Sequence, residues 1–223
     1  MHIDPVFLRL AIVIVVSYLL GSIPFGLWIG KIFYHVDIRE YGSGRTGGTN
    51  VLRTCGKIPF VCSVAGDFLK SFGAVYLSTV IMGDSVGMIG DIAVNAPTLK
   101  VMAGLAAVFG HIWPIFADFR GGRGVATFMG GLTALCIWAA LFSLILLIFI
   151  VTTTRFMSLG SVVAVVGSYV IMIPLTLLGH YPTEYMAYVL LGSILIVVAH
   201  SDNIIRLITG KERKVGQKAE KNN

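Results

Sequence analysis

The chain has 223 residues, of which 56% are hydrophobic and only 13% are charged, and its net charge is +6. Soluble domains are about 45–50% apolar and about 25% charged, so this chain has too little polar surface to cover a water-soluble globule. The composition predicts an integral membrane protein. It argues against a nucleic-acid-binding protein, because most of the basic residues lie between apolar runs.

Apolar runs long enough for membrane-spanning helices occur along most of the chain. A hydrocarbon core of about 30 Å requires roughly 20 apolar residues in helical form. The clearest candidates are residues 10–30, 58–82, 92–117, 156–178 and 185–199. The N-terminus lacks the charged start and cleavage site of a signal peptide, so we expect the first run to be a retained span. We predict one all-α membrane domain over residues 1–210 and a flexible, basic, polar tail over residues 211–223.

The run between Arg123 and Arg155 is ambiguous. Its 31 residues include no Asp, Glu, Lys or Arg. One continuous helix would be about 46 Å long, which exceeds a plain span, whereas a hairpin would have two short arms. The local sequence favours one long helix, since Gly130 and Gly131 are the only breakers and both lie early. The distribution of charge favours the hairpin, which gives a polytopic bundle of about seven transmembrane helices.

Lysines and arginines are distributed unevenly between the two sides that this topology defines. Of the 17 basic residues, 14 fall in one group of loops and in the C-terminal tail. Cytoplasmic loops are enriched in Lys and Arg. We therefore predict that these loops and the C-terminus are cytoplasmic and that the N-terminus is outside.

A glycine-rich loop occupies residues 41–53, with the sequence Y-G-S-G-R-T-G-G-T-N-V-L-R. Its glycines permit positive φ angles and close backbone approach, so that successive N–H groups can line an anion site. These glycines are Gly42, Gly44, Gly47 and Gly48. Neutral donors are Ser43, Thr49 and Asn50, and charged donors are Arg45 and Arg53. Arginine side chains suit phosphate geometry, so the loop predicts a phosphate site; the alternative is a flexible loop with arginines that reach the interface.

A second glycine-rich loop occupies residues 110–127, with the sequence G-H-I-W-P-I-F-A-D-F-R-G-G-R-G-V-A-T. The candidate ligands are His111, Arg120, Gly121, Gly122 and Arg123. Glycines before Val125 would leave a helix N-terminus bare, which favours bound anions. His111 is either an interfacial residue or, beside two arginines, a hydrogen-bond donor or proton acceptor.

Polar residues also occur at the end of the last span and inside the second. Their i, i+3 spacing puts His200, Asn203 and Arg206 on one side of a helix. This side is either a polar cap of the helix or part of a binding site. Asp67 and Lys70 lie at membrane depth, where charges should pair with each other or face a polar cavity. The three cysteines form no metal-binding pattern, so we predict no metal site.

Four segments together resemble the motifs of a known family. They are GSGRTGGTNVLR, GHIWPIFADFRGGRGVAT, RFMSLGS and HSDNIIRL followed by GKE, and SIPFG and the Asp67–Lys70 segment fit as well. From about Leu19 to Glu212 the chain resembles the bacterial acyl-phosphate:glycerol-3-phosphate acyltransferases, the PlsY family. Departures from that family are Arg45 for the usual Asn, Arg120 and Arg123 for common Lys, and Ser201 for a frequent basic residue.

The resemblance implies a seven-helix enzyme of the bacterial inner membrane, with the active site on its cytoplasmic face. The reaction would move a fatty acyl group from acyl phosphate to the 1-hydroxyl of sn-glycerol 3-phosphate, giving lysophosphatidic acid and phosphate. It implies a polar site of Ser43, Arg53, Arg120, Ser158, His200 and Asn203. We expect His111, Ser43, Arg53 and Asn203 to be catalytic. We expect substrate to be bound by Gly42, Gly44, Arg45, Gly47, Thr49, Asn50, Arg120, Gly121, Gly122, Arg123, Ser158 and His200.

Acyl phosphate is a mixed anhydride with a good leaving group, so the enzyme needs mainly proximity and charge stabilisation. Another family of glycerolipid acyltransferases has a histidine followed by Asp five residues later, and no histidine of this chain is followed by such an Asp. The proton acceptor stays open among His111, His200 and a substrate phosphate, and we expect direct transfer without a cofactor. The soluble enzyme that makes acyl phosphate is a possible partner. A transporter of anionic solutes is the chief alternative; a membrane scaffold would leave the loop motifs unexplained.

Overall fold

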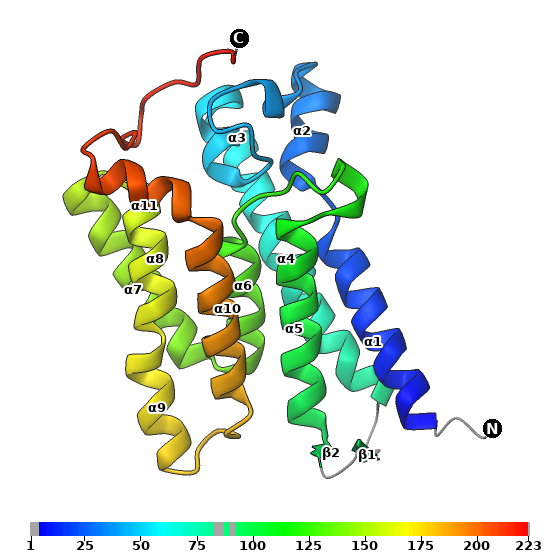
Figure 1. Cartoon of the computed structure of the whole chain (residues 1–223). Coiled ribbons are helices and arrows are strands. Elements are labelled where there is room, and N and C mark those ends of the chain that lie inside the picture. Colours follow the sequence, from blue (N-terminus) through cyan, green and yellow to red (C-terminus); the bar gives the residue numbers. More distant parts are fainter. Residues whose placement is uncertain (1–4, 83–86, 90–91, 223) are drawn as a thin grey trace.

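The computed structural model describes residues 5–82, 87–89 and 92–222 and consists almost entirely of helices (Figure 1). The helices are α1 (Pro5–Gly21), α2 (Phe25–Tyr34), α3 (Gly48–Cys55), α4 (Lys57–Met82), α5 (Ala96–Ile112), α6 (Val125–Leu135), α7 (Ile137–Thr154), α8 (Met157–Gly167), α9 (Tyr169–Leu177), α10 (Tyr185–Ala199) and α11 (Ser201–Ile208). Short 3-10 helices are η1 (Ile38–Glu40) and η2 (Ile115–Ala117), and the antiparallel strands β1 (Gly87–Ile89) and β2 (Ile92–Val94) pair with each other.

Among the described residues, five helical segments are long and apolar enough to cross a membrane. They are Phe7–Tyr34, Lys57–Ile81, Ala96–Ala117, Ile137–Thr154 and Met157–Leu177. The pair α10–α11, bent by 61°, would make a sixth. The short apolar helix α6 is not among them, because its 11 residues extend only about 16 Å, roughly half of the hydrocarbon core. The described residues therefore give five or six candidate spans, against the predicted number of about seven. The predicted all-α polytopic bundle is confirmed.

The run between Arg123 and Arg155 is a hairpin, as the charge distribution predicted. Its arms are α6 and α7, and the turn lies at Cys136, where the backbone is extended (Figure 1). Gly130 and Gly131, the only breakers in the sequence of this run, lie inside α6, where Gly130 allows close packing against α4. A Cβ on Gly130 would lie 2.0 Å from the backbone oxygen of Phe68 in α4. The hairpin brings Arg123 and Arg155 to the same end of the bundle.

Three predicted spans differ from continuous helices. The first is broken between α1 and α2 at Ser22–Pro24, where proline cannot donate a backbone hydrogen bond. The span over residues 156–178 changes direction at Ser168, between α8 and α9. The predicted start of the third span at residue 92 is wrong, because Asn95 caps α5 by accepting from the Thr98 N–H. Residues 90–91, just before it, lie outside the described part of the chain.

The largest buried cluster among the described residues joins α4 to α10. At its centre the rings of Phe128 and Tyr188 stack at 5.0 Å, and the Tyr188 hydroxyl donates to the Phe128 carbonyl over 2.9 Å. The outer face of α7 is different: Ile145, Ile148 and Phe149 are all more than half exposed. Such an apolar exposed face suits lipid rather than water.

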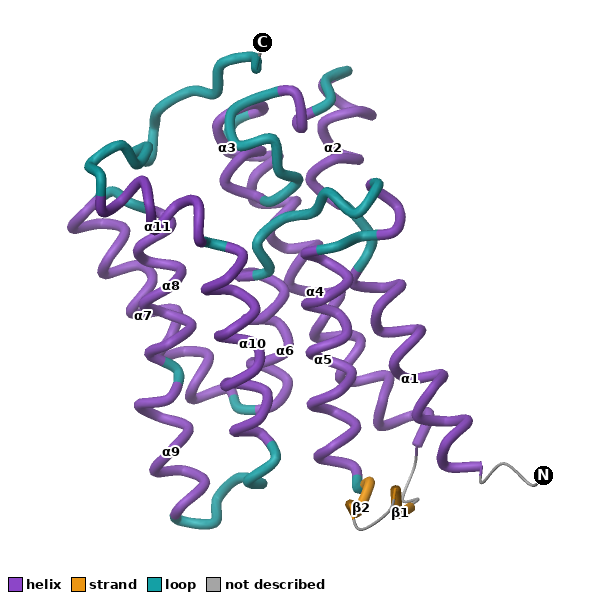
Figure 2. The backbone as a smooth tube through the Cα atoms, viewed as in Figure 1, coloured by secondary structure: helices purple, strands orange, loops and turns teal. Residues whose placement is uncertain are grey.

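The irregular segments with most of the candidate residues gather at one end of the bundle. Figure 2 shows both glycine-rich loops and the C-terminal segment at this end, opposite the start of α1. The segment after α11 does not extend freely from it. The Gly42 N–H donates to the Glu220 carbonyl (2.9 Å), the Asn222 N–H to the Glu40 carbonyl (2.8 Å) and the Val215 N–H to the Arg155 carbonyl (2.8 Å). These contacts place the C-terminal segment against the first glycine-rich loop and Arg155.

Candidate active site

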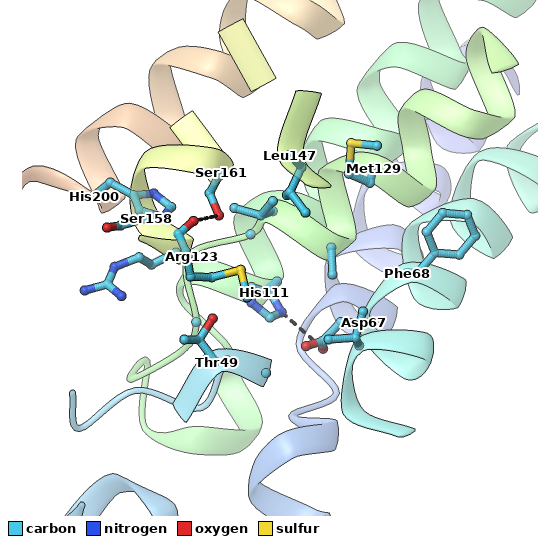
Figure 3. Close-up of a pocket in the computed structure, with 18 of the residues that line it drawn as sticks. Thr49, Asp67, Phe68, His111, Arg123, Met129, Leu147, Ser158, Ser161 and His200 are labelled. Carbon is cyan, nitrogen blue, oxygen red and sulfur yellow. Dashed lines mark hydrogen bonds and ion pairs between the residues drawn. The ribbon is translucent and has the colours of Figure 1, made fainter. Parts of the chain in front are cut away.

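A cavity of about 470 Å³ opens among the two glycine-rich loops, α4, the α6–α7 hairpin, α8 and the α10–α11 bend (Figure 3). Its wall has a polar and an apolar part. The polar part includes Ser43, Arg45, Thr49, Asn50, Arg53, His111, Arg123, Ser158, His200, Asn203 and Glu212. The apolar part includes Phe60, Val64, Phe68, Met129, Ile137, Leu141, Leu144 and Leu147. The cavity is therefore amphipathic, with charged groups at the loop end and hydrocarbon between α4 and the hairpin.

Asn50 organises the first glycine-rich loop from within. Its buried amide nitrogen donates to the carbonyls of Ile38 (2.8 Å), Tyr41 (3.1 Å) and Arg45 (2.9 Å), and its oxygen accepts from the Ser43 N–H (3.2 Å). The positive φ angles predicted for loop glycines occur at Gly42 (57°) and Gly44 (67°). The loop is thus a built structure, and its shape turns Ser43 toward the cavity wall.

Gly47 and Gly48 act by close approach. A Cβ on Gly48 would lie 2.6 Å from a side-chain carbon of Val64 in α4, and one on Gly47 would lie 3.5 Å from the Cα of Gly122. The two glycine-rich loops therefore meet backbone to backbone. Larger residues would hold them apart.

The second loop is fixed by packing against His111. The Gly122 N–H donates to the His111 carbonyl over 3.1 Å. A Cβ on Gly121 would lie 2.0 Å from that carbonyl, and one on Gly122 would lie 2.2 Å from the His111 ring Nε2. Helix α6 begins at Val125 with no side-chain cap, as predicted, so its N-terminal N–H groups face the cavity wall.

Arg123 connects the second loop to the α10–α11 bend. Its Nε donates to the Ala199 carbonyl (3.1 Å), and an Nη donates to Asp202 (2.8 Å). Burial lowers the pKa of the Arg123 guanidinium to about 10; the Asp202 carboxylate opposes the shift and Arg45 adds to it. Arg123 stays cationic at neutral pH.

At the α10–α11 bend the side chains of His200 and Asn203 are buried against the cavity. His200 Nδ1 lies 2.8 Å from the Ile196 carbonyl, so Nδ1 carries a proton and Nε2 is left as an acceptor. Asn203 donates to Glu212 over 2.8 Å, and its own Oδ1 is buried without a partner among the described residues. Bending the helix here turns both side chains inward.

Glu212 joins three elements, and sequence reasoning gave it no role. Its carboxylate accepts from Ser158 (3.1 Å), Asn203 (2.8 Å) and Arg206 (2.9 Å). A signal existed, because Glu212 ends the GKE segment that belongs to the recognised motifs. Asp67 both pairs with Lys70 and lines the cavity, so the two alternatives expected for this charge hold together.

Arg53, at the end of the first loop, has an available donor. Its Nη2 donates to the Arg213 carbonyl (3.2 Å), whereas its Nε is buried without a partner among the described residues. Burial and then the charge of Arg213 lower the pKa of Arg53. An anion beside Nε would satisfy this donor.

Most of the predicted site residues meet at the cavity. Those that line it are Ser43, Arg45, Gly47, Thr49, Asn50, Arg53, His111, Gly122, Arg123, Ser158, His200 and Asn203. Those outside its lining are Gly42, Gly44, Arg120 and Gly121. Arg120 is exposed, while the three glycines shape the loops. No three His, Cys, Asp or Glu side chains within the described part of the chain could together hold a metal ion.

A family model described as glycerol-3-phosphate acyltransferase matches residues 11–210. The chain belongs to this family. A relative from Dehalococcoides mccartyi, glycerol-3-phosphate acyltransferase 3, is 50% identical over 211 residues, covering 95% of this chain and 98% of the relative. A relative from Trichodesmium erythraeum, glycerol-3-phosphate acyltransferase, is 36% identical over 215 residues, covering 93% of this chain and 92% of the relative.

Solved structures of this family superpose on the chain. The glycerol 3-phosphate form of PlsY, an integral membrane glycerol 3-phosphate acyltransferase, has a TM-score of 0.79 and 36% identity, covering 93% of this chain and 96% of PlsY. Its lysophosphatidic acid form has a TM-score of 0.77 and 34% identity, covering 93% of this chain and 95% of PlsY. The chain is therefore a multi-pass membrane glycerol-3-phosphate acyltransferase, and the predicted family is confirmed.

Proposed function

We propose that the enzyme transfers a fatty acyl group from acyl phosphate to the 1-hydroxyl of sn-glycerol 3-phosphate, giving lysophosphatidic acid and phosphate. The observation that carries this proposal is the amphipathic cavity, in which buried, unpartnered polar atoms lie beside an apolar slot. A small hydrophilic acceptor and a long-chain donor need both environments at one place. As the donor, acyl phosphate has an anionic head group that the cationic loops can bind.

The phosphate groups would lie at the loop end of the cavity. Arg45, Arg53 and Arg123 line this end, and the uncapped start of α6 adds backbone N–H groups. Arg53 Nε is the best placed donor, because it is buried and has no partner among the described residues. A buried unpaired donor costs roughly 1–3 kcal/mol, which a phosphate oxygen would recover. Arg45, present where the family usually has Asn, adds cationic charge to the same wall.

The glycerol hydroxyls would lie near the α10–α11 bend. Asn203 Oδ1 is a buried acceptor without a partner among the described residues, and His200 Nε2 is a second acceptor. Hydroxyl groups can donate to both. Ser43 and Ser158 line the same space and can donate to or accept from glycerol or phosphate oxygens.

The acyl chain would lie between α4 and the α6–α7 hairpin, along Phe60, Phe68, Met129, Leu144 and Leu147. In this position its carbonyl faces the loops. The 1-hydroxyl oxygen attacks that carbonyl carbon, a C–O bond forms, and the bond from the carbonyl carbon to the phosphate oxygen breaks. The hydroxyl proton passes to His200 Nε2 or to the departing phosphate. No acyl-enzyme is required, because the leaving group is already good.

The active site would face the cytoplasm of a bacterial inner membrane, with the N-terminus outside. Both glycine-rich loops and the C-terminal segment, which hold most basic residues, share one end of the bundle (Figure 2). There the enzyme can take glycerol 3-phosphate from water and acyl phosphate from the membrane or from the soluble enzyme that makes it.

The test uses purified protein in detergent with radiolabelled glycerol 3-phosphate. Three donors with the same acyl chain are compared in parallel: acyl phosphate, acyl-CoA and acylated acyl carrier protein. Lysophosphatidic acid and an equal amount of phosphate are expected with acyl phosphate alone. Arg53→Ala is the matched control, because it should lower any product that depends on this site.

Equal rates with the thioester donors would overturn the assignment of acyl phosphate as the donor. A covalent acyl adduct on Ser43, Ser158 or a cysteine would overturn direct transfer. Uptake into proteoliposomes without product would favour a transporter.

A further inference from the structure

Three ionisable side chains form a closed cluster beneath the second glycine-rich loop. Lys70 Nζ lies 3.0 Å from Asp67 Oδ1 and 2.8 Å from His111 Nδ1, and the last two atoms are 3.3 Å apart. The side chains are only 2–6% exposed. Charges in a membrane domain are costly unless paired or used. This cluster is paired, but Asp67 and His111 also line the active-site cavity, which a purely structural pair would not require.

The hydrogen-bond capacity of Lys70 is completely used. An ammonium group has three donors and no acceptor. The three acceptors around Nζ are Asp67 Oδ1 (3.0 Å), His111 Nδ1 (2.8 Å) and the Ile23 carbonyl (3.1 Å) in the break between α1 and α2. Charged Lys70 therefore ties three helical segments together. It also requires that His111 Nδ1 accept a hydrogen bond.

This requirement fixes the tautomer of His111. If Nδ1 accepts, the proton of the neutral ring lies on Nε2. Nε2 is the atom that faces Gly122, where a Cβ would lie only 2.2 Å away. Figure 3 shows the ring between Asp67 and the cavity side chains. His200 has the opposite arrangement, with its proton on Nδ1 and an accepting Nε2. The two histidines of the site are therefore a donor and an acceptor.

We propose that Asp67 and Lys70 are positioning residues that hold His111 as a neutral Nε2–H donor at the cavity wall. His111 then donates to an anionic oxygen of the bound acyl phosphate or of the oxyanion that forms from its carbonyl. It is not the base that takes the hydroxyl proton, because its only other nitrogen is occupied by Lys70. This inference rests on the proposed function and assigns roles that the recognised motifs do not distinguish.

The first test is spectroscopic and does not depend on turnover. Protein carrying ¹⁵N-histidine in detergent is compared with His111→Gln to assign the His111 ring signals. We expect the proton on Nε2 in the wild type and a mixture of tautomers in Lys70→Met. Ser71→Ala, another buried α4 position, is the matched control and should leave the His111 signals unchanged. A proton on Nδ1 in the wild type, or an unchanged tautomer in Lys70→Met, would overturn the proposal.

The second test separates donor from base kinetically. Gln can place an N–H near the position of His Nε2, whereas the shorter Asn cannot. We expect His111→Asn to lower kcat/KM by about tenfold to a hundredfold, the range for a lost hydrogen bond to a charged group. His111→Gln should recover most of this loss, although Gln cannot act as a base. Equal loss in both variants, with unchanged elution and thermal unfolding, would contradict the donor role.

Folding failure of Lys70→Met would not remove the test. Lys70→Arg retains the charge and donors, and Asp67→Asn retains an acceptor, so both should fold and keep His111 on the Nε2 tautomer. A kcat close to that of the wild type, together with a retained Nε2 tautomer, supports the positioning role. Reduced activity with an unchanged tautomer contradicts it. All variants are measured against the wild type with the donor that the wild type uses, so failure of the donor assignment is seen separately in the wild-type assay.

Discussion

The two glycine-rich loops have similar sequences but are held in different ways. The first is organised by hydrogen bonds from one of its own side chains, Asn50, and contains glycines with positive φ. The second is organised by packing, because Gly121 and Gly122 leave no room for a Cβ beside His111. In both loops, then, glycine serves two physical purposes. Glycines with a positive φ set the backbone path, whereas others, such as Gly48 and Gly122, allow close approach to a neighbour.

The arginines of the two loops differ in whether their donors already have partners. Arg53, at the end of the first loop, has a buried Nε without a partner among the described residues. Arg123, in the second, already donates to Ala199 and Asp202, and Arg120 is exposed. We infer that the first loop supplies the arginine contacts to the ligand, whereas Arg123 of the second loop mainly builds the wall of the site. Each prediction below tests this division.

The largest effect is expected from Gly122→Ala. Its Cβ would clash with His111 Nε2 at 2.2 Å, so the loop or the ring must move. A misplacement of about 1 Å in an active site can cost about a hundredfold in rate, and we expect kcat/KM to fall at least that far. The matched control is Gly44→Ala, whose Cβ would meet nothing nearer than the Arg39 carbonyl oxygen at 3.4 Å, although the φ of this residue is 67°. It should cost about 1–2 kcal/mol of stability while largely retaining activity. Equal kinetic losses would erase the distinction between packing and backbone path.

Arg53→Ala should come next. Loss of a charge-assisted hydrogen bond worth about 1.5–3 kcal/mol predicts that KM for glycerol 3-phosphate rises about tenfold to a hundredfold. Thermal unfolding should change little, because among the described residues the Arg53 side chain donates only to the Arg213 carbonyl in the tail. Arg53→Lys should recover part of the loss, since Lys retains the charge but not the planar fork.

Arg123→Ala is the comparison from the second loop. It removes contacts to both Ala199 and Asp202, so melting temperature and activity should fall together. If Arg53→Ala lost expression and activity in equal measure, Arg53 would be a structural residue. The division between a ligand loop and a wall loop would then be wrong.

Much of the fold could be predicted because membrane burial imposes long apolar runs. The hairpin followed from charge sidedness, although its turn at Cys136 carries no glycine or proline signal. The helix breaks were less predictable. Pro24 was a visible breaker, whereas Ser168 and His200 change the chain direction through tertiary packing that a single-sequence pattern does not encode.

The site was predictable as a set of motifs but not as a set of contacts. Spacing placed His200 and Asn203 on one helical side, and both line the cavity. Glu212 was missed although it ends the GKE segment of the recognised motifs, because a sequence does not show that its carboxylate reaches Ser158, Asn203 and Arg206. Arg120 was included because a sequence cannot show which of two neighbouring arginines faces inward. Its exposure depends on the turn at Asp118 and Phe119, both of which have positive φ.

Truncation after Glu212 should have a smaller effect than Arg53→Ala. The removed segment accepts from the Gly42 N–H at Glu220 and from Arg53 at Arg213, so both ends of the first loop lose support. Net hydrogen bonds of about 0.5–1.5 kcal/mol predict a rise in KM for glycerol 3-phosphate of about twofold to tenfold, with kcat little changed.

Lys218→Ala is the control for this truncation, because it removes a tail charge and leaves the backbone path intact. It should behave as the wild type. A KM unaffected by truncation would show that the first loop holds its shape through Asn50 alone.

The smallest effect is expected from Arg120→Ala, which tests the second loop at the position where family resemblance and geometry disagree. The resemblance places this side chain in the polar site, but it is exposed and outside the cavity lining. Exposed substitutions usually change stability by less than about 0.5 kcal/mol. We expect kcat and both KM values to stay within about twofold of the wild type. A loss as large as that of Arg53→Ala would mean that Arg120 turns inward when substrate binds, so that the second loop also supplies ligand contacts.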